Sequence, residues 1–359
     1  MPWLIDGLVV LSCLSVLGSH LAQQHWIFDA VAQFLLPSIW MLVAAPVLLV
    51  AFMLWPRISL KHGGFVPLAL AGLFAGTPIL HDPVIPVPDD AVKLKVYQHN
   101  IYVENIVFER IVNTVEREDP DIIALVEARD DTLAPWEARL QERWPYMAKA
   151  HTRRYSWARL RLFSKYPIKD YQVRKRDYEP ATLHARVETP KGEITVIVAH
   201  FTRPWPFMEP EAQMRHYRAL EKMLDGISGP LVVLGDFNST PWGRIGRRMQ
   251  DDLGFHLANQ RWAGTWPGRV NIDDMMDTPG LARFLTIPID LAFCRGGLVC
   301  NNHRVGENLG SDHRLTQFDI WVPEPGALTL DDGHGEDGAS SLAPCRGACE
   351  TPPKRPRVN

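Results

Sequence analysis

Charged side chains are nearly absent from the first part of this 359-residue chain. Residues 1–80 consist mainly of apolar runs, and so little polar surface excludes an ordinary soluble helical bundle there. The whole chain carries a formal charge of only -3. It therefore lacks the excess of positive charge that would require a long polyanion as partner. An internal repeat is also lacking, which excludes solenoids and propellers.

Cysteine is scarce as well, with five in the chain. Cys13 lies in an apolar run, where we interpret it as a small apolar residue. Cys294 and Cys300 flank a short stretch expected to be a hairpin turn, so they can face each other and form a disulfide in an oxidising compartment. Cys345 and Cys349 can form a second disulfide under the same conditions. Zinc binding is the alternative, but no accompanying Cys or His set completes a structural zinc site.

Three apolar stretches occupy the N-terminal part, at residues 3–22, 34–55 and 63–80. Each is close to the roughly 20 residues needed to cross a bilayer. A cleaved signal peptide is the competing interpretation of the first stretch, but residues 1–6 contain an acid and no Lys or Arg. We therefore expect residues 1–82 to form a bundle of about three transmembrane helices with the lipid bilayer as its partner.

The orientation of such a bundle depends on the positive residues between the spans. Arg57 and Lys61 follow the second span, and positive residues favour the cytoplasmic side. Three spans then place the C-terminal domain outside the cytoplasm, whereas two spans reverse that answer. The proline-rich residues 83–92 are expected to form a semi-rigid linker that holds the next domain near the membrane.

The pattern from residue 93 to residue 321 is typical of one soluble α/β domain. Residues 108–117 and 210–224 have apolar side chains at helical spacing, which predicts two amphipathic helices. Residues 183–188 and 194–198 alternate as the strands of a hairpin. Residues 322–359 are rich in Pro, Gly, Asp and Ser without periodicity, so we expect a disordered tail.

An apolar strand at residues 231–234 leads into Gly235, Asp236, Phe237 and Asn238. Side chains two apart on an extended backbone share a face, so Asp236 and Asn238 are expected on the same side. A carboxylate beside a carboxamide suits phosphate-ester chemistry, because the acid can activate water while the amide donates to a phosphoryl oxygen. The alternative is an ordinary strand-end turn capped by these side chains.

Other apolar runs along the chain also carry a polar residue at or near one end. In order, these polar residues are Asn100, Glu127, His200, Asp290 and the pair Asp312 and His313. Together with the Gly-Asp-Phe-Asn segment, this series resembles the endonuclease/exonuclease/phosphatase superfamily, in particular a membrane-anchored bacterial-type member. The resemblance covers residues 93–321. It implies a DNase-I-like α/β fold, a two-sheet β-sandwich flanked by helices.

The resemblance also implies a divalent-metal site. Glu127 is expected to be the principal ligand, with Asn100 beside it and Asp312 as a further ligand or electrostatic neighbour. Hard oxygen ligands of this kind suit Mg²⁺ or Mn²⁺. No cofactor other than the metal is implied.

The remaining residues are expected to act on the phosphate and the water. Asp236 orients or activates the water and Asn238 holds it, or an oxygen of the transition state. His313 contacts the phosphate and is held in its tautomer by Asp290, and His200 is a second imidazole facing the phosphate.

Two positions depart from the family pattern, namely Val126, where Gln is common, and Val198, where Asn is common. Neither removes a catalytic group. The acidic residues 273, 274 and 277 imitate a metal site, but a solvated loop is the better interpretation. His99, His184 and His303 lie near catalytic strands and are at most supporting residues.

These observations predict a membrane-anchored, metal-dependent phosphoesterase that hydrolyses phosphodiester or phosphomonoester bonds. Its substrate is either a nucleic acid, as for a nuclease, or a phospholipid head group. Basic groups that can meet phosphates are at residues 153–154, 159, 161, 174–176, 244 and 247–248, although solvated surface charge is the commoner explanation of each. A membrane-tethered binding module without activity is the third alternative, and no protein partner is inferred.

Overall fold

The computed structural model describes residues 2–53, 65–150, 159–174, 181–268 and 284–324. The chain divides into two units, residues 1–327 and 328–359, and the second unit lies outside the described residues. The predicted tail from residue 325 onward, the pair Cys345 and Cys349, and the acidic loop at 271–277 also lie outside them. So do Arg57 and Lys61, on which the predicted orientation depends.

Four apolar helices and a short 3₁₀ turn make up the N-terminal part. They are α1 (Pro2–Leu21), α2 (Trp26–Ala32), α3 (Leu35–Met53), α4 (Phe65–Gly76) and η2 (Thr77–Leu80). Helix α1 packs against α2, α3 and α4, and a common apolar cluster that includes Val9, Leu36, Ile39 and Leu42 joins them. The helices therefore form one bundle.

Among the described residues, one helix is long and apolar enough to cross a membrane, namely α1 over Leu4–Leu21. Helices α2 and α3 qualify only as a pair, and they are bent by 56° at the break between them. The apolar helix at Phe65–Leu80 is shorter. The apolar character of the N-terminal part is confirmed, but the three predicted spans are not.

The rest of the described chain forms two six-stranded sheets. The first has the order β11-β12-β1-β2-β4-β3 and the second β5-β6-β7-β8-β10-β9. Their strands are β1 (Val92–Asn100), β2 (Ile122–Val126), β3 (Tyr146–Ala150), β4 (Leu160–Ser164), β5 (Ile168–Arg174), β6 (Thr182–Thr189), β7 (Gly192–His200), β8 (Leu231–Asp236), β9 (His256–Leu257), β10 (Asp290–Arg295), β11 (Val299–Val305) and β12 (Thr316–Val322). The hairpin predicted before His200 is confirmed as β6 and β7.

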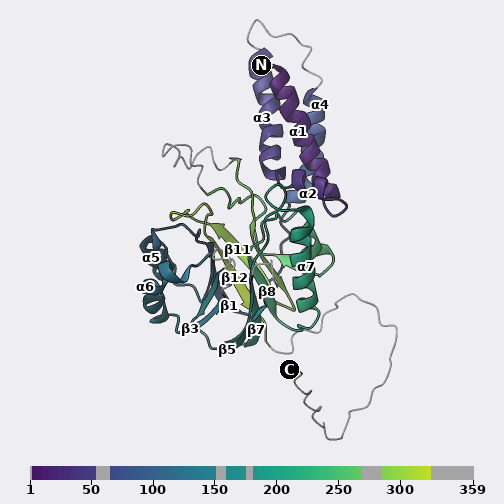
Figure 1. Cartoon of the computed structure of the whole chain (residues 1–359). Coiled ribbons are helices and arrows are strands. Elements are labelled where there is room, and N and C mark those ends of the chain that lie inside the picture. Colours follow the sequence, from purple (N-terminus) through teal and green to yellow (C-terminus); the bar gives the residue numbers. More distant parts are fainter. Residues whose placement is uncertain (1, 54–64, 151–158, 175–180, 269–283, 325–359) are drawn as a thin grey trace, which may run out of the picture. The chain divides into compact units, whose positions relative to one another are not determined.

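The two sheets pack face to face through a shared apolar core, which includes Val96 and Ala124 of one sheet and Val196 and Leu234 of the other. Helices α5 (Phe108–Glu118) and α6 (Asp130–Gln141) cover the outer face of the first sheet. Helices α7 (Pro210–Leu224) and α8 (Arg244–Asp251) cover the second. Figure 1 shows α5 and α6 on one side of the strands and α7 on the other. The predicted sandwich flanked by helices is confirmed, as are the two predicted amphipathic helices.

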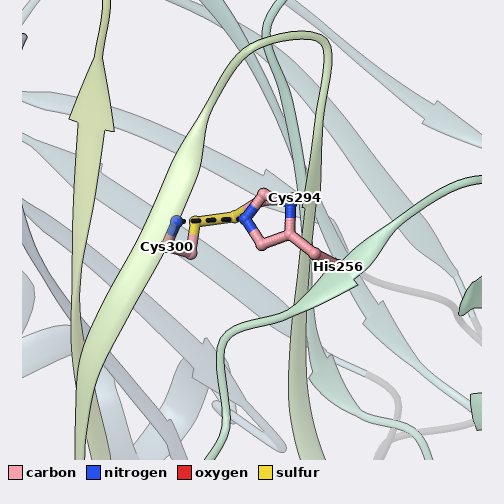
Figure 2. A group of neighbouring side chains, drawn as sticks. All are labelled: His256, Cys294 and Cys300. Carbon is pink, nitrogen blue, oxygen red and sulfur yellow. Dashed lines mark hydrogen bonds between the residues drawn. A yellow bond between two sulfur atoms is a disulfide. The ribbon is translucent and has the colours of Figure 1, made fainter. Parts of the chain in front are cut away.

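The disulfide between Cys294 and Cys300 joins the two sheets, because Cys294 belongs to β10 and Cys300 to β11. The prediction that these cysteines face each other is confirmed. The expected hairpin is wrong, since β10 pairs with β8 and β9 while β11 pairs with β12. Figure 2 shows His256 of β9 beside the bridge, where its Nε2 accepts a hydrogen bond from the Cys300 backbone N–H at 3.1 Å. The group resembles a metal site in composition, but both sulfur atoms are already bonded to each other.

Candidate active site

Two parallel strand pairs bring the predicted site residues to one edge of the sandwich. In the first sheet β1 runs parallel to β2, with Asn100 opposite Val126, so Glu127 follows directly beside Asn100. In the second sheet β7 runs parallel to β8, with His200 opposite Asp236. Because parallel strands end at the same edge, each pair delivers two polar groups together.

Strand β10 runs antiparallel to β8, and its first residue, Asp290, lies opposite Asp236. A strand that ends at Asp236 and one that begins at Asp290 thus meet at the same edge. The turn before β12 supplies the last groups, because Ser311 Oγ donates to the Asn100 carbonyl oxygen at 2.7 Å and accepts from the His313 backbone N–H at 3.0 Å. Ser311 therefore fastens the turn that carries His313 to the end of β1.

Gly235 allows β7 and β8 to approach closely just before the site. Its φ is +139°, and a Cβ atom at this position would lie 1.9 Å from the Ala199 carbonyl oxygen. Any side chain here would push apart the two strands that carry His200 and Asp236. The glycine that the sequence places before Asp236 is therefore required by the backbone.

Asn100 is at the centre of the site and links three of the other groups. Its Nδ2 donates to Glu127 Oε1 at 3.2 Å and to Asp236 Oδ2 at 3.0 Å, and it lies 3.4 Å from His313 Nε2. Its Oδ1 accepts from the Tyr102 backbone N–H at 3.1 Å. In this orientation the amide nitrogen faces the carboxylates, so Asn100 organises them. A role as a metal ligand requires the opposite amide orientation.

Glu127 is buried, and both of its oxygens have partners. Oε1 accepts from Asn100, and Oε2 accepts from the Val103 backbone N–H at 2.8 Å. Burial raises the pKa of the Glu127 carboxyl, while the positive charge of His313 opposes the shift. Its backbone has a φ of +61°, a conformation that non-glycine residues rarely adopt and that is common at functional sites.

Asp236 and Asn238 lie together, although not for the reason that the strand pattern gives. Strand β8 ends at Asp236, and Asn238 has a left-handed φ of +47°. The Asn238 backbone N–H donates to Asp236 Oδ1 at 2.9 Å, and Asn238 Nδ2 lies 3.3 Å from Asp236 Oδ2. The same Nδ2 donates to the Phe201 carbonyl oxygen at 3.0 Å. The side chains meet through a turn, which holds the Asp236 carboxylate in place.

His313 and Asp290 form the shortest polar contact between two side chains of the site. His313 Nδ1 lies 2.8 Å from Asp290 Oδ2, and His313 Nε2 lies 3.7 Å from Asp236 Oδ2. Burial alone would lower the pKa of His313, but the carboxylates of Asp290 and Asp236 outweigh burial and raise it to about 10. His313 is therefore a buried cation at neutral pH, with Nδ1 directed toward Asp290.

His200 is buried beside the two carboxylates of the first and second sheets. Its Nε2 lies 3.8 Å from Glu127 Oε1 and 3.5 Å from Asp236 Oδ2. Burial raises the pKa of the Asp236 carboxyl to about 7, with the charge of His313 opposing the shift and the neighbouring Asp290 adding to it. A carboxylate with a pKa near neutrality is well suited to accept a proton.

The donor set fits a divalent cation. The nearest polar atoms of Asp236, Asp290 and His313 lie within 4.8 Å of one another, but a protonated His313 has no lone pair to offer, so the carboxylate oxygens are the groups that suit a metal. Asp312 is half-buried, and its Oδ1 has no hydrogen-bond partner in the part of the chain that the structure describes. The same holds for Asp290 Oδ1. Buried carboxylate oxygens that lack a donor are the atoms that a hard cation such as Mg²⁺ satisfies.

Two supporting residues, Asn259 and Gln213, were not predicted from the sequence. Asn259 Nδ2 donates to the Asp290 carbonyl oxygen at 2.8 Å and lies 3.0 Å from His303 Nε2. Gln213 of α7 donates to the Asn238 carbonyl oxygen at 2.8 Å. His99 Nε2 lies 3.4 Å from the His313 carbonyl oxygen, so His99 and His303 are both supporting residues. The partners of Asn259 and Gln213 are distant in the chain, so no local pattern points to these two residues, whereas His99 and His303 were expected to be supporting residues.

One predicted basic group proves to be structural. Arg161 is fully buried on β4 and forms ion pairs with Asp130 and Glu137 of α6. It attaches that helix to the first sheet, and its guanidinium is already paired with the two acids. The groups at residues 153–154 and 175–176 lie outside the described residues.

Comparison with protein-family models matches residues 97–313 to the endonuclease/exonuclease/phosphatase family. The chain belongs to this family. All eight predicted site residues lie within the matched range. Members of the family are typically phosphoesterase hydrolases that use a divalent metal, so the chain is a phosphoesterase-type or nuclease-like hydrolase.

Solved structures agree on the fold at low sequence identity. The endonuclease/exonuclease/phosphatase from Bacteroides vulgatus has a TM-score of 0.52 and 14% identity, over 64% of this chain and 99% of its own. TDP2 from Caenorhabditis elegans has a TM-score of 0.51 and 16% identity, over 72% and 82%. A conserved protein of unknown function from Enterococcus faecalis has a TM-score of 0.51 and 14% identity, over 63% and 99%. Comparison with curated protein sequences finds no match.

Proposed function

We propose that this chain is a membrane-anchored, divalent-metal-dependent phosphoesterase that hydrolyses phosphodiester bonds, with phosphomonoesters as the alternative substrate. The observation that supports this function best is the position of Asn100, whose amide joins Glu127 and Asp236 beside His313. Acids and imidazoles from both sheets thus converge on one point. Burying this many ionisable groups costs folding free energy and gives an inactive binding module no advantage.

Each group has a distinct task in the proposed reaction. Glu127 and Asp312 would hold Mg²⁺ or Mn²⁺, and a bound cation would supply charge that polarises the phosphoryl oxygens. Asp236, held by the turn to Asn238, orients the attacking water and accepts its proton. Protonated His313 donates from Nε2 to a phosphoryl oxygen while Asp290 fixes its ring. His200 is placed to contact a second phosphoryl oxygen or the leaving group.

The dependence on metal is tested with the full chain in detergent micelles. Bis(p-nitrophenyl) phosphate serves as diester and p-nitrophenyl phosphate as monoester. EDTA should abolish turnover, and Mg²⁺ or Mn²⁺ should restore it. Glu127→Gln should raise the metal concentration needed for half-maximal rate, and calorimetry should show weaker binding of the metal itself. Full activity in the chelator, with metal absent by elemental analysis, would overturn the mechanism.

We also propose that the N-terminal helices cross the membrane three times and that the catalytic domain lies outside the cytoplasm. Helix α1 and the bent pair α2 and α3 supply two candidate spans, and Phe65–Leu80 is the third, shorter candidate. The bond between Cys294 and Cys300 supports an oxidising location. Alkaline phosphatase fused after residue 359 should be active. If only a cytoplasmic-type reporter is active there, the orientation is reversed.

A further inference from the structure

The loop that follows the catalytic strand β8 is attached to the base of the helical bundle, defined as residues 20–35 and 76–82. The Thr240 backbone N–H, two residues beyond Asn238, donates to Gln33 Oε1 at 2.8 Å. The indole N–H of Trp242 donates to the Ala32 carbonyl oxygen at 2.7 Å. Trp242 is fully buried within the apolar cluster of the bundle. The loop that follows Asn238, which forms one rim of the site, is therefore in direct contact with the bundle base.

Further polar contacts fix the same arrangement. Asp29 Oδ1 of α2 accepts from the backbone N–H of Arg244, the first residue of α8, at 2.7 Å. Gln23 donates to Asp251 at 2.9 Å, at the other end of α8. Asp82, just after η2, accepts from the Arg261 backbone N–H at 3.1 Å. Contacts from three separate segments hold the site rim in one orientation toward the helices.

The rim beside the bundle base exposes large apolar side chains. In the loop that follows His200, Trp205, Phe207 and Met208 are 50%, 65% and 47% exposed. The Trp205 ring lies 5.4 Å from that of Trp26, the first residue of α2. A cluster of exposed apolar side chains on the surface of a protein domain indicates an interaction site.

A second exposed group contacts α3. Trp262, Phe284 and Leu285 are 42%, 49% and 58% exposed. The rings of Trp262 and Phe284 lie 5.7 and 5.3 Å from that of Trp40. Trp40 is five residues beyond the start of α3 at Leu35, which at 1.5 Å per residue is about 8 Å along the helix. We call the two exposed groups together the aromatic rim: residues 205, 207, 208, 262, 284 and 285.

The occupant that fits the aromatic rim is the head-group layer of a bilayer. The rim touches the first residue of α2 and the second turn of α3, and the apolar surface continues nearby in Ile27 and Phe34, which are 49% and 58% exposed. Trp and other aromatic rings concentrate at the level of lipid head groups. Arg203, exposed in the same loop as Trp205, adds a cation suited to lipid phosphates.

We propose that the aromatic rim lies in the membrane surface, so that the site opens onto the bilayer and its substrate is a phosphate ester carried by a membrane lipid. This inference rests on the proposed membrane anchoring and phosphoesterase activity. A lipid in the same bilayer reaches the site by lateral diffusion, and its phosphate lies at the depth of the rim.

The depth of the rim is tested without any activity measurement. Phe207→Cys, in a chain where Cys13, Cys345 and Cys349 are Ser, carries a nitroxide label in phosphatidylcholine vesicles. Contact with lipid-soluble oxygen should exceed contact with a water-soluble nickel chelate. Tyr171→Cys, 45% exposed on β5, is the matched control and should show the reverse. A label at 207 as accessible to the chelate as that at 171 would overturn the proposal.

The substrate is tested with the full chain in phosphatidylcholine vesicles that contain phosphatidylglycerol or phosphatidic acid. Phe207→Ser with Met208→Ser should slow hydrolysis of the lipid about tenfold or more, and Tyr171→Ser should not. Hydrolysis of bis(p-nitrophenyl) phosphate should be unchanged in all variants. If single-stranded DNA or RNA is cleaved and lipid is not, the lipid substrate is wrong. If wild-type protein with metal hydrolyses none of these esters, the proposed function itself fails, whatever the label at 207 reports.

Discussion

The Nδ1 atom of His313 and the Oδ2 atom of Asp290 lie 2.8 Å apart, although 22 residues separate them in the chain and they come from different elements. The pair forms where the turn before β12, in one sheet, meets the start of β10, in the other. The interaction thus spans the two halves of the sandwich. It holds one imidazole in a single orientation at the point where the other site residues converge.

Asp290→Asn should lower turnover and move the alkaline limit of activity to lower pH. Asp290 helps to raise the pKa of His313 to about 10, so the protonated imidazole is lost as pH rises through that value. Without the carboxylate the pKa falls and the loss occurs earlier. A pH profile of kcat measures the change. Asp319→Asn, which removes a buried carboxylate of β12 outside the site, is the control and should leave the profile unchanged.

Asp236→Asn and His313→Ala should each reduce kcat by about 100-fold to 10,000-fold, the range typical of single acid-base and electrostatic groups. KM should change less. Asp236→Asn relieves crowding of negative charge in a buried site, so its melting temperature should stay near that of the wild type or rise. His313→Ala removes the cation that compensates Asp290 and Asp236, so its melting temperature should fall. Steady-state kinetics and thermal unfolding in the same detergent separate the effects. Near wild-type rates in folded protein would show that the site is assigned wrongly.

His216 should make the fold sensitive to acid. It is buried on α7, where its ring stacks on Phe201 with centroids 4.4 Å apart, and burial lowers its pKa from 6.5 to about 4. At a pH between about 4 and 6.5, His216 is protonated in the unfolded chain and neutral in the folded chain. This histidine therefore costs about 1.4 kcal/mol of stability per pH unit as pH falls from 6.5 toward 4.

The substitution His216→Phe keeps the stacked ring and removes the titrating group. The slope of stability against pH, measured by urea unfolding between pH 7 and pH 4.5, should become smaller by about that amount. Equal slopes for the two proteins would mean that His216 is protonated in the folded state or is not buried there.

Removal of the disulfide should weaken the packing of the two sheets without abolishing catalysis. The bridge between Cys294 and Cys300 closes a short loop, with a sequence separation of 6, so the expected loss is about 2 kcal/mol. Cys294→Ala with Cys300→Ala should lower the melting temperature and leave kcat near the wild-type value, since the site lies at the other end of β10. A reducing agent should shift the melting temperature of the wild type and not that of the variant. Equal melting temperatures would indicate that the bridge is absent.

Much of the site could be predicted because it lies at the ends of buried strands. Apolar runs of β-branched and aliphatic residues mark β2, β7 and β8, and the polar residue after each run is conspicuous. The position of Asp236 beside Asn238 was also predicted, but the reason given was wrong. Asn238 leaves the strand and turns back through its left-handed backbone. The turn interpretation and the catalytic interpretation therefore describe the same geometry.

The sequence alone determined the apolar N-terminal part, the strands that lead into the site, helices α5 and α7 and the polar groups at the strand ends, because these follow from hydrophobic period and local backbone preference. Only the tertiary structure decided which strand ends meet, that β10 and β11 belong to different sheets, and that Trp242 and Gln33 attach the catalytic loop to the helices. Those pairings join residues far apart in the chain. Long-range packing determines which of these residues pair, and the local sequence around each residue does not identify its partner.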